Sequence, residues 1–276
     1  MLRSMAMPVY DMVGPVVYKL RGRRPWSFGY TAHKRRQIAA ILRGGTFDAD
    51  ALPPGYGYRL DERVVEYPWF LSRLPAGGGL LLDAGSVLNH RFILEHPKLV
   101  SKNVFISTLA PEAECAWRRG VSYVYEDLRD SSFRDDRFDW VSSLSTVEHI
   151  GLDNTMLYTA DARKRENDTG SFQAAIREFR RVLKPGGTLY LSVPFGRHRN
   201  HGWFQVFDGA MVDELIGVFA PARASQTYFR YLPEGWVRGD RASANDATYF
   251  DIHERKSPDG DFAAASRAVV CLELVK

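Results

Sequence analysis

Several histidines are of a type that could move a proton during a reaction. His149 follows a predicted strand at 138–144, and His198 and His201 lie in a loop that also holds aromatic and basic residues. Because an imidazole ionises near neutral pH, such a side chain could take a proton from an acceptor hydroxyl. A histidine next to Glu148 could also be held by hydrogen bonds as part of the structure. Glu148 and Asp153 could join His149 at a metal, but their spacing matches no metal motif, so we predict no metal site.

The stretch 79–90, reading GLLLDAGSVLNH, carries a second chemical feature. Its three leucines form a short apolar run that suits a strand buried on both faces. Asp83 follows this strand, and Gly85 allows a sharp turn or a positive φ. In open α/β sheets such a turn lies at the carboxyl edge, where ligands bind. An acidic residue there disfavours a bare phosphate and favours a ligand that offers hydroxyls or a positive charge.

Strands and helices alternate from Leu80 onward, which indicates a parallel sheet with helices on both faces. We predict strands at 80–83, 103–107, 122–125, 138–144, 188–193, 227–231 and 266–274. Helices are predicted at 87–96, from Pro111 to Gly120, at 171–183 and at 211–219. Three connections are too long for plain loops and are predicted to be binding lids or mobile segments, namely 151–170, 195–207 and 232–262.

The first 75 residues are predicted to form an N-terminal cover, and residues 76–276 the main domain. Residues 1–29 are punctuated by proline and glycine and are predicted to be irregular, followed by helices at 31–43 and 61–74. Residues 1–36 hold eight Lys or Arg against Asp11 alone, which is a net charge of 8 − 1 = +7. This basic arm could meet a phosphate-bearing substrate, an anionic membrane surface or nucleic acid. It could also be solvated, or contact another subunit as in a homodimer.

The composition is that of an ordinary globular protein, with 276 residues of which 45% are hydrophobic and 25% charged. No apolar run reaches the roughly 20 residues that span a bilayer, and the N-terminus lacks the pattern of a signal peptide. Cys115 and Cys271 form no metal or redox motif. These features predict a cytoplasmic protein without an integral membrane segment.

Four stretches, in order, resemble the class I S-adenosylmethionine-dependent methyltransferases. They are LLDAGS at 81–86, YEDLRD at 125–130, FDWVSSLSTVEHIG at 138–151 and EFRRVLKPGGTLYLSVPFG at 178–196. The resemblance implies that family's α/β fold, a doubly wound and mostly parallel sheet of seven strands with an antiparallel last strand. Within the family, DAGSVLNH and STVEHIGLDN are similar to a less studied branch without an assigned substrate.

The resemblance also implies S-adenosylmethionine as the cofactor and a set of residues that hold it. The acidic turn would contact the methionine part of the cofactor. The end of the second strand would contact its ribose, and the end of the third strand would contact its adenine. Where many relatives have a ribose-binding acid, this sequence offers Thr108 or, one turn later, Glu112. Val87 and Asn89 stand where further glycines are common. The implied cofactor-binding residues are Asp83, Ala84, Gly85, Ser86, Thr108, Asp127, Leu128 and Ser145.

The chemistry implied by the resemblance is SN2 transfer of the sulfonium methyl group to an acceptor atom. The aromatic, histidine-bearing loop at 195–207 and the predicted lids favour O-methylation of a small molecule or a saccharide, with His149 or His198 as the base. A non-catalytic relative that keeps the sheet and acts as a scaffold or partner subunit is the main alternative. A nucleic-acid substrate is a weaker one, since the sequence has no recognisable RNA-binding module.

Overall fold

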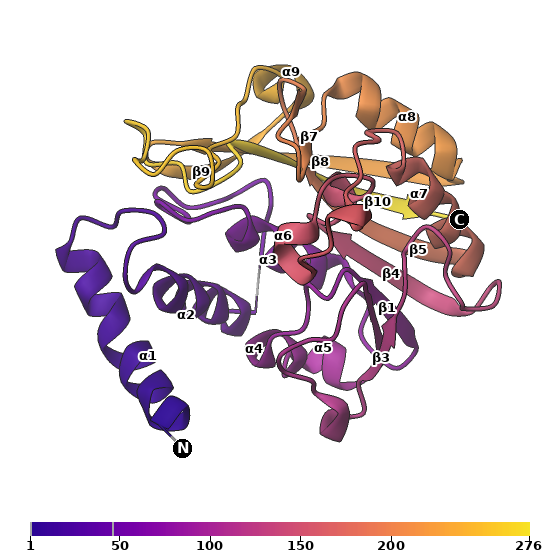
Figure 1. Ribbon diagram of the computed structural model, residues 1–276, viewed down its shortest axis with the longest axis horizontal. Helices are drawn as coiled ribbons and strands as arrows, with labels where there is room; N and C mark the ends of the chain where they lie inside the picture. Colours follow the sequence, from indigo (N-terminus) through magenta and orange to yellow (C-terminus); the bar gives the residue numbers. More distant parts are fainter. Residues whose placement is uncertain (1, 46) are drawn as a thin grey trace.

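A twisted sheet of eight strands forms the centre of the part of the chain that the computed structural model describes, residues 2–45 and 47–276 (Figure 1). The strand order is β3-β2-β1-β4-β5-β10-β8-β9. The strands are β1 (Leu80–Ala84), β2 (Asn103–Thr108), β3 (Ser122–Tyr125), β4 (Phe138–Leu144), β5 (Leu183–Pro194), β8 (Arg223–Leu232), β9 (Gly235–Gly239) and β10 (Ala268–Val275).

Strands β1 to β5 run parallel to one another, so their carboxyl ends meet at one edge of the sheet. Strand β10 is antiparallel to both β5 and β8. This arrangement confirms the predicted doubly wound, mostly parallel sheet with an antiparallel last strand. The edge formed by the parallel strands is the place where this type of sheet binds ligands.

The predicted count of seven strands is wrong because β9 adds an eighth. It pairs antiparallel with β8 in a tight hairpin, inside the segment 232–262 that the sequence indicated to be a loop. Trp236 of β9 is buried, and its Nε1 donates to the Leu60 carbonyl at 2.9 Å. The extra strand is therefore stabilised by packing on the N-terminal cover, a contact that local sequence does not reveal.

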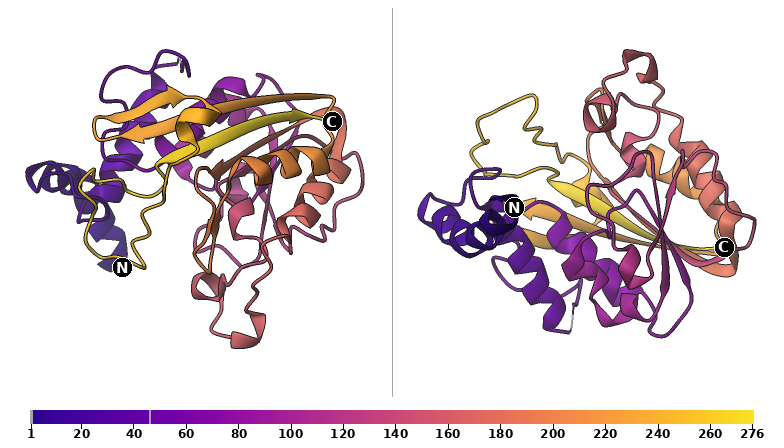
Figure 2. Two further views of the ribbon diagram at one scale, coloured as in Figure 1. Left: turned by 90° about the horizontal axis from the view of Figure 1, so that it is seen from above. Right: turned by 60° about the horizontal axis from the view of Figure 1, so that its bottom comes forward.

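Helices cover both faces of the sheet (Figure 2). One face packs against α7 (Phe172–Val182) and α8 (Gly209–Phe219), and the other against α3 (Arg63–Arg73), α4 (Arg91–Leu94) and α5 (Pro97–Val100). Because side chains alternate along a strand, Leu81 packs in the core on the α3 side of the sheet, and Leu82 packs in the core on the α7 side. This burial on both faces explains why β1 reads as an unbroken apolar run.

The N-terminal cover contains one helix more than predicted. Residues 1–29 were expected to be irregular, but Leu2–Leu20 form helix α1, followed by α2 (Tyr30–Arg43) and α3. Gly14 lets α1 approach the start of α2, since a Cβ on Gly14 would lie 3.2 Å from the Gly29 Cα. The glycine that suggested a chain break is thus a close-packing position within a helix.

Two helices predicted after β1 and β2 are shorter or missing. The segment 87–96 forms only the four-residue α4, and Pro97 begins α5 instead of ending a helix, as its fixed φ favours. Between Pro111 and Gly120 the structure has only a 3₁₀ turn, η1 (Trp117–Arg119). Most side chains in this segment are exposed, so no buried apolar face stabilises a helix there.

The three predicted lid segments each contain short elements. Segment 151–170 holds α6 (Thr155–Tyr158) and η3 (Ala162–Lys164), segment 195–207 holds the hairpin β6 (Arg199–Asn200) and β7 (Gln205–Val206), and segment 232–262 holds β9 and α9 (Arg241–Ala244). The turn η2 (Val147–His149) follows β4. Among the described residues, no helix has the length and apolar character needed to cross a membrane.

Candidate active site

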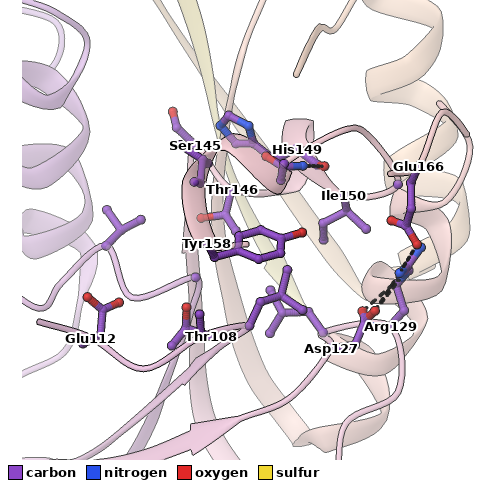
Figure 3. Close-up of a pocket in the computed structure, with 18 of the residues that line it drawn as sticks. Thr108, Glu112, Asp127, Arg129, Ser145, Thr146, His149, Ile150, Tyr158 and Glu166 are labelled. Carbon is purple, nitrogen blue, oxygen red and sulfur yellow. Dashed lines mark hydrogen bonds and ion pairs between the residues drawn. The ribbon is translucent and has the colours of Figure 1, made fainter. Parts of the chain in front are cut away.

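A cleft of about 390 Å³ lies at the carboxyl ends of β1 to β4, partly covered by segment 151–170 (Figure 3). This volume is in the range of small-molecule sites. Each strand contributes the residues that follow it. The lining consists of Gly85 and Val87 after β1, 108–112 after β2, 127–129 after β3, 145–146 and 149–151 after β4, Arg63 of α3, and Asn154, Leu157, Tyr158 and Glu166 of the segment above.

Asp83 lies beneath this cleft and does not line it. The Leu88 N–H donates to its Oδ2 at 2.8 Å, and the Ser142 hydroxyl donates to its Oδ1 at 3.4 Å. Burial raises the pKa of Asp83 from 3.8 to about 7, because a low-dielectric environment disfavours the charged form. The carboxyl group therefore shapes the turn after β1, and the turn in turn forms the floor of the cleft.

Gly85 is the point where this turn touches the loop after β4. Its φ is +115°, and a Cβ at this position would lie 2.3 Å from Thr146 Oγ1. Both the backbone conformation and the close approach require glycine. The neighbours Ala84, which is buried, and Ser86, which has a φ of +62°, belong to the same turn but do not line the cleft.

Side chains that can accept hydrogen bonds lie at the ends of β2 and β3. Thr108 and Glu112 both line the cleft, and Glu112 is half-buried with no ion pair to any described residue. Asp127 lies opposite them, and within the described chain the neighbouring Leu128 N–H has no backbone acceptor. The cleft thus presents carboxylates and a free amide to a ligand that carries hydroxyls and an exocyclic amine.

Arg129 joins the rim of the cleft to the lid segment. It donates to Asp127 through Nε at 3.0 Å and Nη2 at 2.6 Å, and Nη2 also lies 2.7 Å from Glu166 Oε1 (Figure 3). Burial acts to raise the pKa of Asp127, but the hydrogen bonds from Arg129 outweigh it and lower that pKa. Asp127 is therefore ionised at neutral pH and can still accept from a ligand.

The N-terminal cover reaches the site through Arg63 of α3. Its Nη1 donates to Glu66 Oε2 at 2.8 Å and to the Leu144 carbonyl at 3.0 Å. Glu66 Oε1 in turn accepts from the hydroxyls of Ser145, at 2.5 Å, and Ser192, at 2.7 Å. This network fixes the backbone at the end of β4 and turns the Ser145 hydroxyl toward α3.

Two further acids beside this network have raised pKa values. Burial raises the pKa of Glu148 well above its usual range. Burial, together with the negative charges of Asp61 and Glu66, raises the pKa of Glu62 to about 8.

His149 lies at the end of the 3₁₀ turn after β4 and lines the cleft (Figure 3). Its Nδ1 is 2.9 Å from the Trp203 carbonyl. A carbonyl oxygen only accepts, so Nδ1 carries the hydrogen and Nε2 keeps its lone pair. Burial lowers the pKa of His149 to about 4, and the positive charge of Arg63 adds to this effect. The ring is therefore neutral at pH 7, with Nε2 free to accept a proton.

The other predicted base, His198, lies elsewhere. Its Nδ1 is 2.9 Å from the Val206 carbonyl, and its side chain borders a separate hollow with Asp208 and Met211. Of the predicted site residues, the structure brings together Gly85, Thr108, Asp127, Leu128, Ser145 and His149 in the cleft. Asp83, Ala84 and Ser86 support it from below.

A comparison with known proteins finds a family match over the part of the chain that forms most of the cleft. Residues 99–191 match the family model of the methyltransferase domain. These residues run from α5 to the second half of β5 and include the loops after β2, β3 and β4 that line the cleft. No curated protein sequence matches the chain.

The solved structures that match this chain include methyltransferases. The 1,6-didemethyltoxoflavin-N1-methyltransferase of Burkholderia thailandensis, solved with S-adenosylhomocysteine, is 15% identical with a TM-score of 0.43, covering 88% of this chain and 78% of its own. An S-adenosylmethionine-dependent methyltransferase of Thermotoga maritima is 13% identical with a TM-score of 0.44, covering 88% and 95%. The YcgJ protein of Bacillus subtilis is 12% identical with a TM-score of 0.46, covering 76% and 97%.

The cleft contains residues that sequence reasoning missed. Arg63 belongs to the N-terminal cover, about 80 residues before the loop it supports, and no local pattern marks it. Arg129 lies inside the YEDLRD stretch, where a basic residue two positions after Asp127 was a usable signal. Tyr158 and Glu166 belong to segment 151–170, whose conformation depends on contacts with the cleft rim.

Proposed function

We propose that this methyltransferase methylates a hydroxyl group of a small molecule or a saccharide. The observation that carries the proposal is the state of His149, a neutral imidazole in the cleft with its Nε2 lone pair available. An alcohol or phenol must lose its proton during methyl transfer, whereas a neutral amine attacks through its lone pair first. A preorganised neutral base is therefore most useful for an oxygen acceptor.

The cofactor would lie along the four strand ends. Asp127 and the Leu128 amide suit the adenine amino group and ring nitrogen, and Glu112 with Thr108 suits the ribose hydroxyls. The turn at Gly85, whose missing Cβ leaves room for close backbone approach, suits the methionine part. When bound there, S-adenosylmethionine supplies a methyl group already activated by its positive sulfur.

The acceptor would then enter between His149 and the lid segment. Ile150, Leu157 and Tyr158 give this side an apolar and aromatic wall, which suits the face of a sugar or phenol ring. His149 would take the hydroxyl proton on Nε2 while Nδ1–H stays on the Trp203 carbonyl. With a pKa near 4 the ring is a weak base, so it acts in concert with methyl transfer rather than by forming an alkoxide beforehand.

The test is an acceptor screen with S-adenosylmethionine, read out as S-adenosylhomocysteine, followed by two alanine variants. We expect His149→Ala to lower kcat by roughly 10²- to 10⁴-fold, the usual contribution of a positioned base, while the cofactor Kd is unchanged. His198→Ala is the matched control, the same residue type outside the cleft, and should keep full activity. Equal turnover by His149→Ala and the native chain, or an accepted substrate methylated on nitrogen or carbon, would overturn the proposal.

A further inference from the structure

Helix α1 has an exposed apolar face against which none of the described residues packs. Among the residues of α1 whose side chains the structure describes, Met12, Val13, Val16 and Leu20 are exposed, with Leu20 at 82%. On an α-helix, positions 12, 13, 16 and 20 lie within one third of the circumference. These four side chains therefore form a single stripe along one face of α1. We call them the α1 outer face.

The opposite side of α1 is firmly packed, so the exposed stripe is not a sign of a loose helix. Gly14, Pro15 and Tyr18 are buried against α2. Tyr18 donates from its hydroxyl to the Arg23 carbonyl at 3.1 Å, and its ring lies 4.9 Å from that of His33. The helix is thus apolar on two sides, one packed on the fold and one exposed, and it lies at the edge of the molecule beside α2 (Figure 1).

A basic and aromatic cluster follows the stripe along the chain. Lys19, Arg21 and Arg24 are exposed and form no ion pair within residues 10–45 and 47–276. Trp26 and Phe28 follow, with 42% and 52% of their surfaces exposed. A helix with an apolar face, neighbouring cations and exposed Trp or Phe has the chemistry of a segment that lies in the headgroup region of a bilayer.

We propose that the α1 outer face, with Lys19, Arg21 and Arg24, docks this methyltransferase on an anionic membrane surface. Charge complementarity favours this occupant. In a two-fold dimer through the same face the unpaired cations of both copies would be brought together, at an electrostatic cost. A nucleic acid would use the cations but would leave the apolar stripe in water.

The binding would be peripheral and electrostatically assisted. Each Lys or Arg near an anionic surface strengthens binding by roughly fivefold, and burial of a large apolar side chain by roughly tenfold or more. Binding should therefore need both acidic lipid and the stripe, and should weaken in high salt.

The experiment is co-sedimentation of the full chain with vesicles of equal parts phosphatidylglycerol and phosphatidylcholine, and with pure phosphatidylcholine vesicles. We expect binding to the acidic vesicles only. Arg21→Ala with Arg24→Ala should lower the partition coefficient about 25-fold, and Val16→Glu with Leu20→Glu should abolish binding. The matched controls are Arg134→Ala, another exposed unpaired arginine, and Val100→Glu, whose residue is 69% exposed on α5; both should bind as the native chain does.

Three results would overturn the proposal. The first is no binding of the native chain to acidic vesicles at low salt. The second is unchanged binding by the Val16→Glu, Leu20→Glu variant. The third is self-association in sedimentation velocity, or an RNA shift, that depends on the same residues while vesicles are not bound. All four variants change exposed side chains, and unchanged thermal unfolding and cofactor affinity would show that they fold.

Discussion

Replacing Asp83 by Asn should change how the stability of this protein depends on pH. The Asp83 carboxyl is fully buried and its pKa is raised to about 7, while in the unfolded chain it titrates near 3.8. Between about pH 4 and pH 7 the folded chain keeps this proton and the unfolded chain has lost it. The contribution of Asp83 to the free energy of unfolding therefore falls as pH rises through this window and levels off above it.

The size of the change in the free energy of unfolding follows from the difference between the folded and unfolded pKa values of Asp83. A slope of up to about 1.4 kcal/mol per pH unit over about three units gives about 4 kcal/mol at most. Asn has no proton to lose, and its amide can keep both contacts, accepting from the Leu88 N–H and donating to the Ser142 hydroxyl. All other titrating groups are shared by the two chains and cancel in their difference.

The assay is urea unfolding of both chains from about pH 5 to about pH 8. We expect Asp83→Asn to gain about 2–4 kcal/mol relative to the native chain over this range. Asp246→Asn, at an exposed position, is the control and should show no such trend. A difference that stays flat with pH would show that Asp83 ionises in the folded chain without cost, and would refute its role as a buried support of the turn.

Three further predictions concern the cleft and its supports. Gly85→Ala should weaken S-adenosylmethionine binding at least tenfold in calorimetry, because the added Cβ would collide with the Thr146 side chain. Adding Thr146→Ala should restore part of the affinity. Normal binding by the single variant would contradict the close approach. Glu112→Gln should raise the cofactor Kd roughly tenfold, the value of a charged hydrogen bond, whereas Glu114→Gln next to it should not; equal effects would remove the ribose role. Glu66→Ala should lower the free energy of unfolding by about 2–4 kcal/mol, since it removes a fully buried carboxylate that accepts from Ser145, Ser192 and the half-buried Arg63; a loss below about 1 kcal/mol in urea unfolding would show that the pair is solvated.

The order and type of the central elements could be predicted because they are encoded locally. Leu80–Leu82 is apolar at every position because β1 is covered on both faces, and 171–183 has the apolar spacing of a surface helix, which the structure confirms as α7. The methyltransferase stretches place Gly85, Thr108, Asp127 and Ser145 directly after strands. Since parallel strands end at one edge of the sheet, these residues were expected to lie close together.

Contacts between distant segments could not be predicted from such patterns. Helix α1 looked irregular because its proline and glycine are packing positions, and β9 looked like loop because its stability comes from Trp236 on the N-terminal cover. Arg63 gave no local sign that it supports the end of β4.

The sequence by itself determined the fold type and the strand ends that build the cleft, because periodicity and short motifs act within a few residues, and its resemblance to the methyltransferases implied the cofactor class. The tertiary structure alone decided which histidine faces the cleft. His149 and His198 have equal chemistry in the sequence, yet only His149 lines the cleft, with Trp203 setting its tautomer and burial keeping it neutral. A side chain's tautomer and pKa depend on the dielectric and hydrogen-bond partners around it, and folding supplies these from residues far away in the chain.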